Sequence, residues 1–408
     1  MSLRILHIST RLILGGSQEN TVLSCEGQAR LGHDVHLAYG PIYGPEGSMH
    51  ERVSRFRTED GRGIALHELP RMVREIRPVK DHVCFHHDLK KLMREVRPDV
   101  VHTHSSKAGV LGRWAAWTAE AGGKRPAVIH TIHGPPFMPA SGDSIERTKT
   151  RAKNTLYAAA ERFAAKRCHL IVSVADAMTE QFLARGIGRP DQYITVRSGM
   201  ELEPFLRAKE RGEGRRVREE LGLRDGDFVI GTVSRLAEHK GHDDLLNALG
   251  GELRARPSWK LLWVGDGRLR DRLMARVRSM GLEGRVITTG LVPPERVPAM
   301  MTAMDVLAHP SHREGLPRTV PQALLCDVCP VAHDVDGTGE ICRDWETGRL
   351  VAPGDRDGLR AAIVHLAENP MERERMAERG RALVMEEFSA ETMVRHLEGV
   401  YARALEMR

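Results

Sequence analysis

Short apolar runs alternate along this 408-residue chain with amphipathic segments of helical period. The pattern predicts strands at residues 3–8, 35–39, 100–103, 128–131 and 170–174, and again at 228–233, 260–264, 285–289, 306–309 and 329–332. Helices are expected between them, for example over residues 18–31 and 243–254. Alternation of this kind is typical of parallel sheets covered by helices on both faces. The predicted fold class is therefore α/β, with doubly wound sheets.

The alternation is interrupted once, between Arg197 and Arg216, where glycine, proline and charged residues gather. We interpret this stretch as a domain connection, which gives an N-terminal domain at residues 1–200 and a C-terminal domain at 201–388. The pattern of residues 389–408 predicts one amphipathic helix, and the family resemblance described below implies that this helix packs back on the first domain. Its apolar positions are Met393, Leu397 and Tyr401.

No apolar run reaches the roughly 18 residues that a membrane span requires. The apolar run at the N-terminus is also too short for a signal peptide, so a cytoplasmic protein is expected. Six cysteines are present, and only Cys326 and Cys329 form a C-x-x-C pair. Because no second pair accompanies them, packing is a better interpretation than zinc or redox chemistry.

The net charge of +6 is unevenly distributed. Residues 1–200 hold 29 Lys and Arg against 20 Asp and Glu, whereas residues 201–408 hold 32 against 35. The densest basic stretch runs from Arg71 to Arg97. It is either a solvated helix face or a contact surface for anionic lipid headgroups at a membrane. Nucleic acid is not expected, because no aromatic residues alternate with the charges.

Glycines and cations follow two of the predicted strands. Gly15 and Gly16 come after the first strand and open a helix, where free N–H groups suit a phosphate, although a plain tight turn is an equal alternative. Arg235 and Lys240 follow the strand at 228–233. Two cations at such a turn are able to neutralise a diphosphate, and solvated surface charges are the alternative.

The segment from Glu314 to Gln322 follows the strand at 306–309 and runs into a helix. Backbone N–H groups near Leu316 and Thr319 are expected at the helix start, where they suit sugar hydroxyls or phosphate. Gln322 lies eight residues after Glu314, about two helical turns. A third set of candidates, His102, His104 and His133, lies at the ends of two strands, where any one of them is more often a structural histidine.

These residues in this order resemble the family 4 glycosyltransferases, retaining enzymes of the GT-B fold. In that fold two Rossmann-like domains face each other across a cleft. The resemblance extends over essentially the whole chain, and its most specific part is the Glu-x7-Glu-like segment that begins at Glu314. Here the second acidic position is Gln322.

The resemblance implies transfer of a hexose from a nucleoside-diphosphate sugar, with UDP or GDP, to a hydroxyl acceptor, without a metal or other cofactor. The acceptor would bind the N-terminal domain and the donor the C-terminal domain. A lipid-linked glycan acceptor in polysaccharide or glycolipid synthesis, at the cytoplasmic face of a membrane, fits the basic first half. The implied catalytic residues are His133, Arg235, Lys240 and Glu314. The implied donor-binding residues are Gly15, Gly16, Val292, Gly315, Leu316, Arg318, Thr319 and Gln322.

Gln322 departs from the family's pattern. A glutamine still bonds ribose, but without the charge that strengthens a carboxylate–hydroxyl bond, so weaker donor binding or a different donor is expected. A nucleotide-sugar epimerase of the same fold and a non-catalytic sugar-binding relative are the alternatives. Within the transferase hypothesis, Glu314 as a covalent nucleophile is an alternative to attack on the face from which the leaving group departs.

Overall fold

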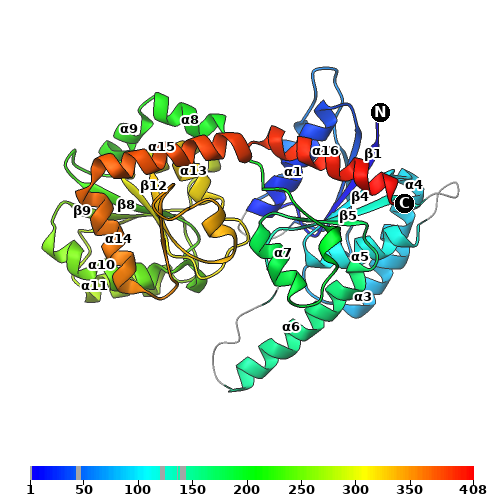
Figure 1. Cartoon of the computed structure of the whole chain (residues 1–408), viewed down its shortest axis with the longest axis horizontal. Helices are drawn as coiled ribbons and strands as arrows, with labels where there is room; N and C mark the ends of the chain where they lie inside the picture. The colour runs from blue at the N-terminus through cyan, green and yellow to red at the C-terminus, as the bar shows by residue number, and fades with distance from the viewer. Residues whose placement is uncertain (1, 43–46, 120–124, 136, 138–143) are drawn as a thin grey trace. The chain divides into compact units, whose positions relative to one another are not determined.

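The structure is a computed structural model that describes residues 2–42, 47–119, 125–135, 137 and 144–408. The chain forms two compact units, shown in Figure 1. Unit 1 contains Met1–Met200 and Ala390–Arg408, and unit 2 contains Glu201–Ser389. Each unit is built around its own parallel sheet with helices on both faces, as the alternating pattern predicts.

Unit 1 holds a seven-stranded parallel sheet in the order β3-β2-β1-β4-β5-β6-β7. Its strands are β1 (Arg4–Ser9), β2 (Asp34–Tyr39), β3 (Ala65–Glu68), β4 (Val100–His104), β5 (Ala127–Ile132), β6 (Leu170–Ser173) and β7 (Tyr193–Thr195). Its helices are α1 (Gly16–Arg30), α2 (His50–Arg55), α3 (Pro78–Val83), the π-helix η1 (Cys84–Leu89), α4 (Lys90–Val96), α5 (Ser106–Trp117), α6 (Ser144–Ala165), α7 (Asp176–Leu183), the 3-10 turn η2 (Pro190–Gln192) and α16 (Ala390–Glu406).

Unit 2 holds a six-stranded parallel sheet in the order β10-β9-β8-β11-β12-β13. Its strands are β8 (Phe228–Val233), β9 (Trp259–Val264), β10 (Val286–Gly290), β11 (Val306–His309), β12 (Cys329–His333) and β13 (Arg349–Val351). Its helices are α8 (Glu203–Glu210), α9 (Glu213–Glu220), α10 (His242–Ala255), α11 (Arg270–Ser279), α12 (Val297–Thr302), α13 (Thr319–Leu325), α14 (Arg356–Glu368) and α15 (Pro370–Glu387), with 3-10 turns η3 (Glu238–Lys240), η4 (Pro294–Arg296) and η5 (Asp336–Glu340).

Helix α16, from the end of the chain, packs on the sheet of unit 1 beside α1 (Figure 1). Ile5, Val100 and Ile129 of the sheet form one buried cluster with Leu23 of α1 and Leu397 of α16. Burying this apolar surface is the main favourable term for docking the helix. The end of the chain therefore completes the core of unit 1.

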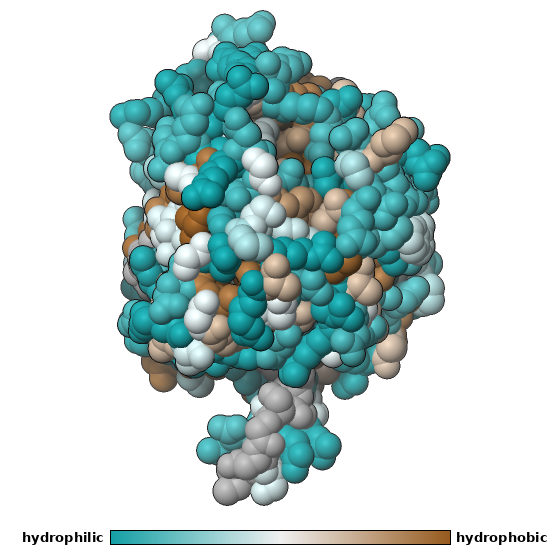
Figure 2. Space-filling model, turned by 90° about the vertical axis from the view of Figure 1, so that its left-hand side faces the viewer, coloured by the Kyte–Doolittle hydropathy of each residue, from teal (hydrophilic) through white to brown (hydrophobic). Residues whose placement is uncertain are grey.

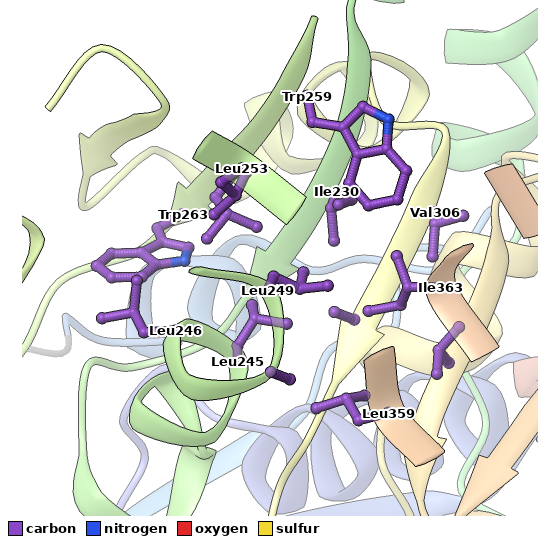
Figure 3. Packing of buried hydrophobic residues seen from close by; sticks show 14 of the residues in the cluster. Ile230, Leu245, Leu246, Leu249, Leu253, Trp259, Trp263, Val306, Leu359 and Ile363 are labelled. Carbon is purple, nitrogen blue, oxygen red and sulfur yellow. The ribbon is translucent and has the colours of Figure 1, made fainter. Parts of the chain in front are cut away.

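The core of unit 2 lies between its sheet and the helices α10 and α14 (Figure 3). Ile230 of β8 and Val306 of β11 meet Leu249 of α10 and Ile363 of α14. Figure 2 shows that one face of this unit is mostly hydrophilic, with hydrophobic residues in small, separated patches. Among the described residues, no helix combines the length and the apolar character that crossing a bilayer requires.

Helices α8 and α9 occupy most of residues 197–216, the stretch interpreted as the domain connection, and the border between the two units lies at Met200 and Glu201. Gly214, which suggested a linker, is instead a helix contact. A Cβ added there would lie 2.2 Å from the carbonyl oxygen of Thr302 in α12. Strands β3, β7 and β13 were not predicted, since they are short edge strands of three or four residues with weak apolar signals.

Candidate functional site

The strand order reverses once in each sheet, between β1 and β4 in unit 1 and between β8 and β11 in unit 2. Loops that leave neighbouring strands on opposite sides of such a switch point open a crevice at the carboxyl ends of the strands, where ligands of doubly wound sheets bind. In unit 2 the two loops are residues 234–241 and 310–318. Both were singled out by the sequence, and they meet at the switch point.

The two loops of unit 2 are tied together by their backbones. The His312 N–H donates to the carbonyl of His239 at 2.8 Å. Gly241 has a φ of 70°, and a Cβ there would lie only 1.9 Å from the carbonyl oxygen of Pro310. Only glycine fits that approach without strain. This contact fixes Lys240 beside the loop that carries Glu314.

Glu314 is the electrostatic centre of this site. Its Oε1 accepts a hydrogen bond from Lys240 Nζ at 2.5 Å, and the two side chains are only 15% and 14% exposed. His309 Nε2 lies 3.1 Å from the same oxygen without completing a hydrogen bond. The backbone N–H of Glu314 donates to Asp336 Oδ2 at 2.6 Å. The structure thus brings the two predicted residues, Lys240 and Glu314, into direct contact.

The surroundings keep Glu314 ionised. Burial alone would raise the pKa of this carboxyl, but His309 and Lys240 beside it outweigh burial and hold the pKa well below its usual range. A carboxylate of such low basicity is a hydrogen-bond acceptor and a weak nucleophile. Lys240 carries three N–H donors, so its bond to Glu314 leaves two for other partners.

His309 and Asp336 belong to this site although the sequence reasoning assigned them no role. Asp336 has a φ of 49°, unusual for a residue other than glycine, and it follows β12 in the same way that the other site residues follow their strands. Gly337 N–H donates to the carbonyl of Gly315 at 3.0 Å and holds this loop against the Glu314 segment. The position directly after a parallel strand was the signal available for Asp336.

Arg235 lies in the same loop as Lys240, five residues before it, and is exposed. The backbone on both sides of Arg235 is bonded to the end of β9 and the loop after it. The Ser234 N–H donates to the carbonyl of Val264 at 3.0 Å, and the Leu236 N–H donates to the carbonyl of Asp266 at 3.0 Å. Gly265, at a φ of 132°, would place a Cβ 2.2 Å from the carbonyl oxygen of Ser234. In the part of the chain that the structure describes, the ion-pair partners of Glu314 are Lys240 and His309, and Arg235 is not among them.

Helix α13 begins at Thr319, at the end of the stretch expected to form the turn and the helix start. Residues 314–318 precede it, so Gln322 sits in the first turn of α13 rather than two helical turns beyond Glu314. Thr319 opens the helix and bonds His309 Nδ1 through its Oγ1 at 3.2 Å. Leu316 is buried, Arg318 is half-buried, and Gln322 N–H donates to the Arg318 carbonyl at 3.2 Å.

Val292 is placed apart from these residues. It follows β10, the edge strand of the sheet, and is half-buried. Its neighbour Leu291 is largely exposed. Two strands, β9 and β8, lie between β10, which precedes Val292, and β11, which precedes the Glu314 segment.

The candidates of unit 1 lie at the carboxyl ends of β1 and β5. Gly15 caps α1, and its carbonyl accepts the Glu19 N–H at 2.9 Å. Gly15 and Gly16 are both exposed at this helix start. His133 follows β5 and is half-buried, with its Nε2 3.0 Å from His104 Nδ1.

The histidines of unit 1 converge, which the sequence alone did not decide. His7, His102 and His104 lie on one face of adjacent strands and are fully buried. His104 Nε2 is 2.9 Å from His7 Nδ1, and His102 Nε2 is 2.6 Å from Thr131 Oγ1. Burial lowers the pKa of His7 to about 4 and also lowers the pKa of His102 and His104 well below the usual value. All three imidazoles are therefore neutral at physiological pH.

Cys326 and Cys329 are buried free thiols at the end of α13 and the start of β12. Burial raises the pKa of each to about 12, so neither forms a thiolate at neutral pH. Both act as small apolar residues in the packing of this connection.

Two family models cover most of the chain. The glycosyl transferase 4-like domain matches residues 15–199, and the glycosyl transferases group 1 model matches residues 214–383. Two Rossmann-like parallel sheets with polar and glycine-rich loops at their switch points are the architecture of the GT-B fold. The chain belongs to the family 4 glycosyltransferases.

Curated relatives agree with that assignment. The chain is 29% identical over 275 residues to the UDP-Gal:alpha-D-GlcNAc-diphosphoundecaprenol alpha-1,3-galactosyltransferase of Escherichia coli, an alignment that covers 66% of this chain and 67% of the relative. It is 30% identical over 242 residues to the 2-deoxystreptamine glucosyltransferase of Streptomyces kanamyceticus, covering 59% of this chain and 62% of the relative. The alignments thus span about two thirds of these relatives or less.

Solved structures show the same fold over the whole chain. Anabaena Alr3699/HepE in complex with UDP and glucose superimposes with a TM-score of 0.77 at 19% identity, covering 98% of this chain and 99% of the other. The sucrose-phosphate synthase of Thermosynechococcus elongatus gives a TM-score of 0.78 at 18% identity, covering 99% and 100%. At these identities the likeness establishes the GT-B fold alone.

The buried histidines make the stability of unit 1 depend on pH. His7, His102, His104 and His130 are neutral in the fold, whereas their unfolded pKa is near 6.5. The unfolded state therefore binds more protons below that pH. Stability is fully present above pH 6.5 and is lost as the pH falls toward 4, by up to about 1.4 kcal/mol per pH unit for each histidine.

We expect unit 1 to unfold at a lower urea concentration at pH 5.5 than at pH 7.5. The measurement is hydrogen exchange of peptides from β1 and β4, with the intrinsic exchange rates corrected for pH. The comparison is His7→Gln, which removes the contribution of one histidine to the change of the free energy of unfolding with pH. Equal midpoints at the two pH values would show that the imidazoles are not held neutral.

Proposed function

We propose that this protein transfers a hexose from a nucleoside-diphosphate sugar to a hydroxyl acceptor with retention of anomeric configuration. The observation that carries the proposal is the buried Lys240–Glu314 pair at the switch point of unit 2. A cation and a carboxylate held together beside a helix start offer donors for a diphosphate and an acceptor for sugar hydroxyls. The names of the relatives and of the UDP-bound structures support this choice of donor class.

Lys240 and Arg235 are proposed to stabilise the leaving diphosphate. Cleavage of the glycosidic bond separates an oxocarbenium-like sugar from a diphosphate, and donors already in place where this charge develops lower the barrier. Lys240 has two donors beyond its bond to Glu314, and Arg235 is exposed and forms a planar fork of donors. These cations supply the countercharge, so the proposed mechanism uses no metal.

Glu314 is proposed to accept hydrogen bonds from the hydroxyls of the donor sugar. Its low pKa, set by His309 and Lys240 against burial, favours this role over that of a covalent nucleophile. Backbone N–H groups of Gly315, Leu316, Arg318 and Thr319, at the approach to α13, are proposed to assist.

The remaining donor contacts follow the family's pattern. Gln322 is proposed to bond the ribose, and the backbone at Val292 to receive the base. Unit 1 is proposed to contribute Gly15 and Gly16 toward phosphate and His133 toward the sugar. Attack on the face from which the diphosphate leaves, with a phosphate oxygen taking the acceptor proton, accounts for retention.

A lipid-linked acceptor is proposed because unit 1 carries a basic surface with exposed apolar residues. Arg77 and Lys80 are exposed, and Ile76 and Val79 beside them are 58% and 80% exposed. Cations around exposed apolar side chains suit the headgroup layer of an anionic membrane. A peripheral contact there would bring the enzyme to an acceptor in the cytoplasmic leaflet.

Removing Lys240 tests the site. We expect Lys240→Ala to lower turnover by about 100- to 1000-fold, the usual cost of removing one donor to a developing oxyanion. The donor for this assay is found first by a thermal-shift screen of UDP, GDP and ADP sugars, because a true donor stabilises the fold by mass action. Near-normal turnover of Lys240→Ala would contradict the assignment.

A double variant separates catalysis from stability. Lys240→Ala leaves the Glu314 carboxylate buried without its cation, which destabilises the fold. Adding Glu314→Gln removes that uncompensated charge and is expected to restore thermal stability without restoring turnover.

Gln322→Glu tests the ribose role. A carboxylate at this position makes a charge-assisted bond to a ribose hydroxyl, so we expect the nucleoside diphosphate to bind about tenfold tighter, about 1.4 kcal/mol, by isothermal titration. Free inorganic diphosphate, which has no ribose, is the matched control and should show no gain. Unchanged nucleotide affinity would place Gln322 outside the ribose site.

Charge reversal tests the membrane contact. Arg77→Glu with Lys80→Glu is expected to weaken binding to vesicles of anionic phospholipid by about 30-fold or more, since each cation near such a surface is worth about 1 kcal/mol. The control is Arg375→Glu with Arg379→Glu, two exposed cations of α15 in unit 2. Equal loss in both variants would indicate a general charge effect and no specific surface.

A further inference from the structure

A continuous chain of hydrogen bonds runs through the buried face of unit 1, from α16 to His133. Gln28 Nε2 of α1 donates to the Tyr401 hydroxyl of α16 at 2.8 Å. Gln28 Oε1 lies 2.7 Å from His7 Nε2, and His7 Nδ1 lies 2.9 Å from His104 Nε2. His104 Nδ1 then lies 3.0 Å from His133 Nε2. The chain links the last helix of the protein to the candidate sugar contact.

The amide of Gln28 gives this chain a direction. A carbonyl oxygen only accepts, so His7 must carry its proton on Nε2 and leave Nδ1 as an acceptor. His104 must then donate from Nε2 and accept at Nδ1. By the same step, His133 carries its proton on Nε2, and Nδ1 holds its lone pair.

A side branch through Tyr401 is consistent with the same direction. Because its oxygen accepts from Gln28, the hydroxyl is available to donate to His102 Nδ1 at 2.6 Å. His102 then donates from Nε2 to Thr131 Oγ1 at 2.6 Å. Burial lowers the pKa of His7, His102 and His104, so the rings stay neutral and each has one donor and one acceptor nitrogen.

We propose that Gln28 and Tyr401 are positioning residues that fix the tautomer of His133, holding its proton on Nε2 and its lone pair on Nδ1. Any hydrogen bond that Nδ1 of His133 makes, with the protein or with a sugar hydroxyl, is then accepted by the ring and not donated. The inference rests on the proposed function for its catalytic consequence, while the tautomer itself does not depend on any substrate.

The same three buried histidines have ring nitrogens within 4.8 Å of one another, which is also a geometry for a metal ion. All six of their ring nitrogens are engaged, with Gln28, Tyr401, Thr131, His133 and each other. A metal would have to displace several of these bonds in a fully buried place. The arrangement therefore favours a relay of neutral imidazoles over a metal site.

The test is nitrogen NMR on the full-length protein labelled with ¹⁵N-histidine at pH 7.5, with the His133 signals assigned by their loss in His133→Gln. We expect a protonated Nε2 and an unprotonated Nδ1 in the wild type. Gln28→Leu removes both hydrogen bonds of the amide and is expected to give a mixture of tautomers at His133. Tyr401→Phe, a milder change that removes only the hydroxyl, is expected to give a mixture as well.

Glu398→Gln is the matched control. Glu398 also belongs to α16 and holds His33 Nε2 at 2.8 Å, outside the chain of imidazoles. The Glu398→Gln variant weakens the docking of α16 but leaves the hydrogen bonds between the imidazoles and Gln28 unchanged. The His133 signals of this variant should therefore match those of the wild type. If Glu398→Gln changes the tautomer as Gln28→Leu does, helix docking and not Gln28 is responsible.

Other outcomes overturn the proposal directly. A proton on Nδ1 of His133 in the wild type would mean the opposite direction, and an unchanged tautomer in both variants would mean no relay. Shifts of the His7, His102 and His104 signals on adding one equivalent of zinc would indicate a metal site instead.

Turnover supplies a second measurement. With the donor in hand, Gln28→Leu is expected to lower kcat by about fivefold, the worth of about one ordinary hydrogen bond, with the circular dichroism unchanged. The expected NMR result in a protein that transfers no sugar would uphold the relay and reject the proposed function alone.

Discussion

Parallel pairing is the constraint on which the rest of this structure depends. A parallel strand can be followed by its neighbour only after a crossover, so the chain leaves every strand of a sheet at the same edge. Each of the two sheets in this protein is wholly parallel and reverses its order once. Lys240 and Glu314 in unit 2 and His133 in unit 1 follow strands for that reason. The topology therefore places the loops that follow the strands at the carboxyl ends of each sheet, whatever side chains these loops carry.

At the carboxyl ends of the strands of unit 2, close backbone contacts determine which loops lie side by side. Gly241 against Pro310 and Gly265 against Ser234 allow loops to approach at distances that a Cβ would forbid. The contact of Gly241 with Pro310 holds Lys240 beside Glu314, and this pairing keeps a buried carboxylate charged. The glycines therefore act on the electrostatics of the site, although they carry no charge themselves.

The sequence predicted the sheets well, because buried parallel strands are continuous apolar runs such as those at 228–233 and 306–309. Short edge strands such as β13 were not predicted, because half-exposed residues give little periodic signal. Helices α8 and α9 escaped because glycine and charge suggested a linker, and only the packing of Gly214 on α12 shows otherwise. Apolar patterning does not distinguish a glycine that permits close packing from one that permits flexibility.

The site was predicted in part. Lys240 and Glu314 were singled out from their places after strands, and the structure adds that their side chains form an ion pair. His309 and Asp336 were missed because a role that depends on contact across two loops leaves no spacing in the sequence. Tyr401 was placed correctly as a buried position of the last helix. Its hydroxyl partner, Gln28, lies 373 residues away, beyond the reach of any local pattern.

Unit 1 is discontinuous in the chain, whereas unit 2 is one uninterrupted segment. During synthesis, residues 1–200 emerge first but lack α16, so the apolar face around Ile5 and Val100 stays uncovered while unit 2 is made. Domains fold as units once their residues are available. Residues 1–200 are thus made before unit 2 but gain their last helix only after it, and a chain that stops short of Ala390 leaves this apolar face of unit 1 uncovered.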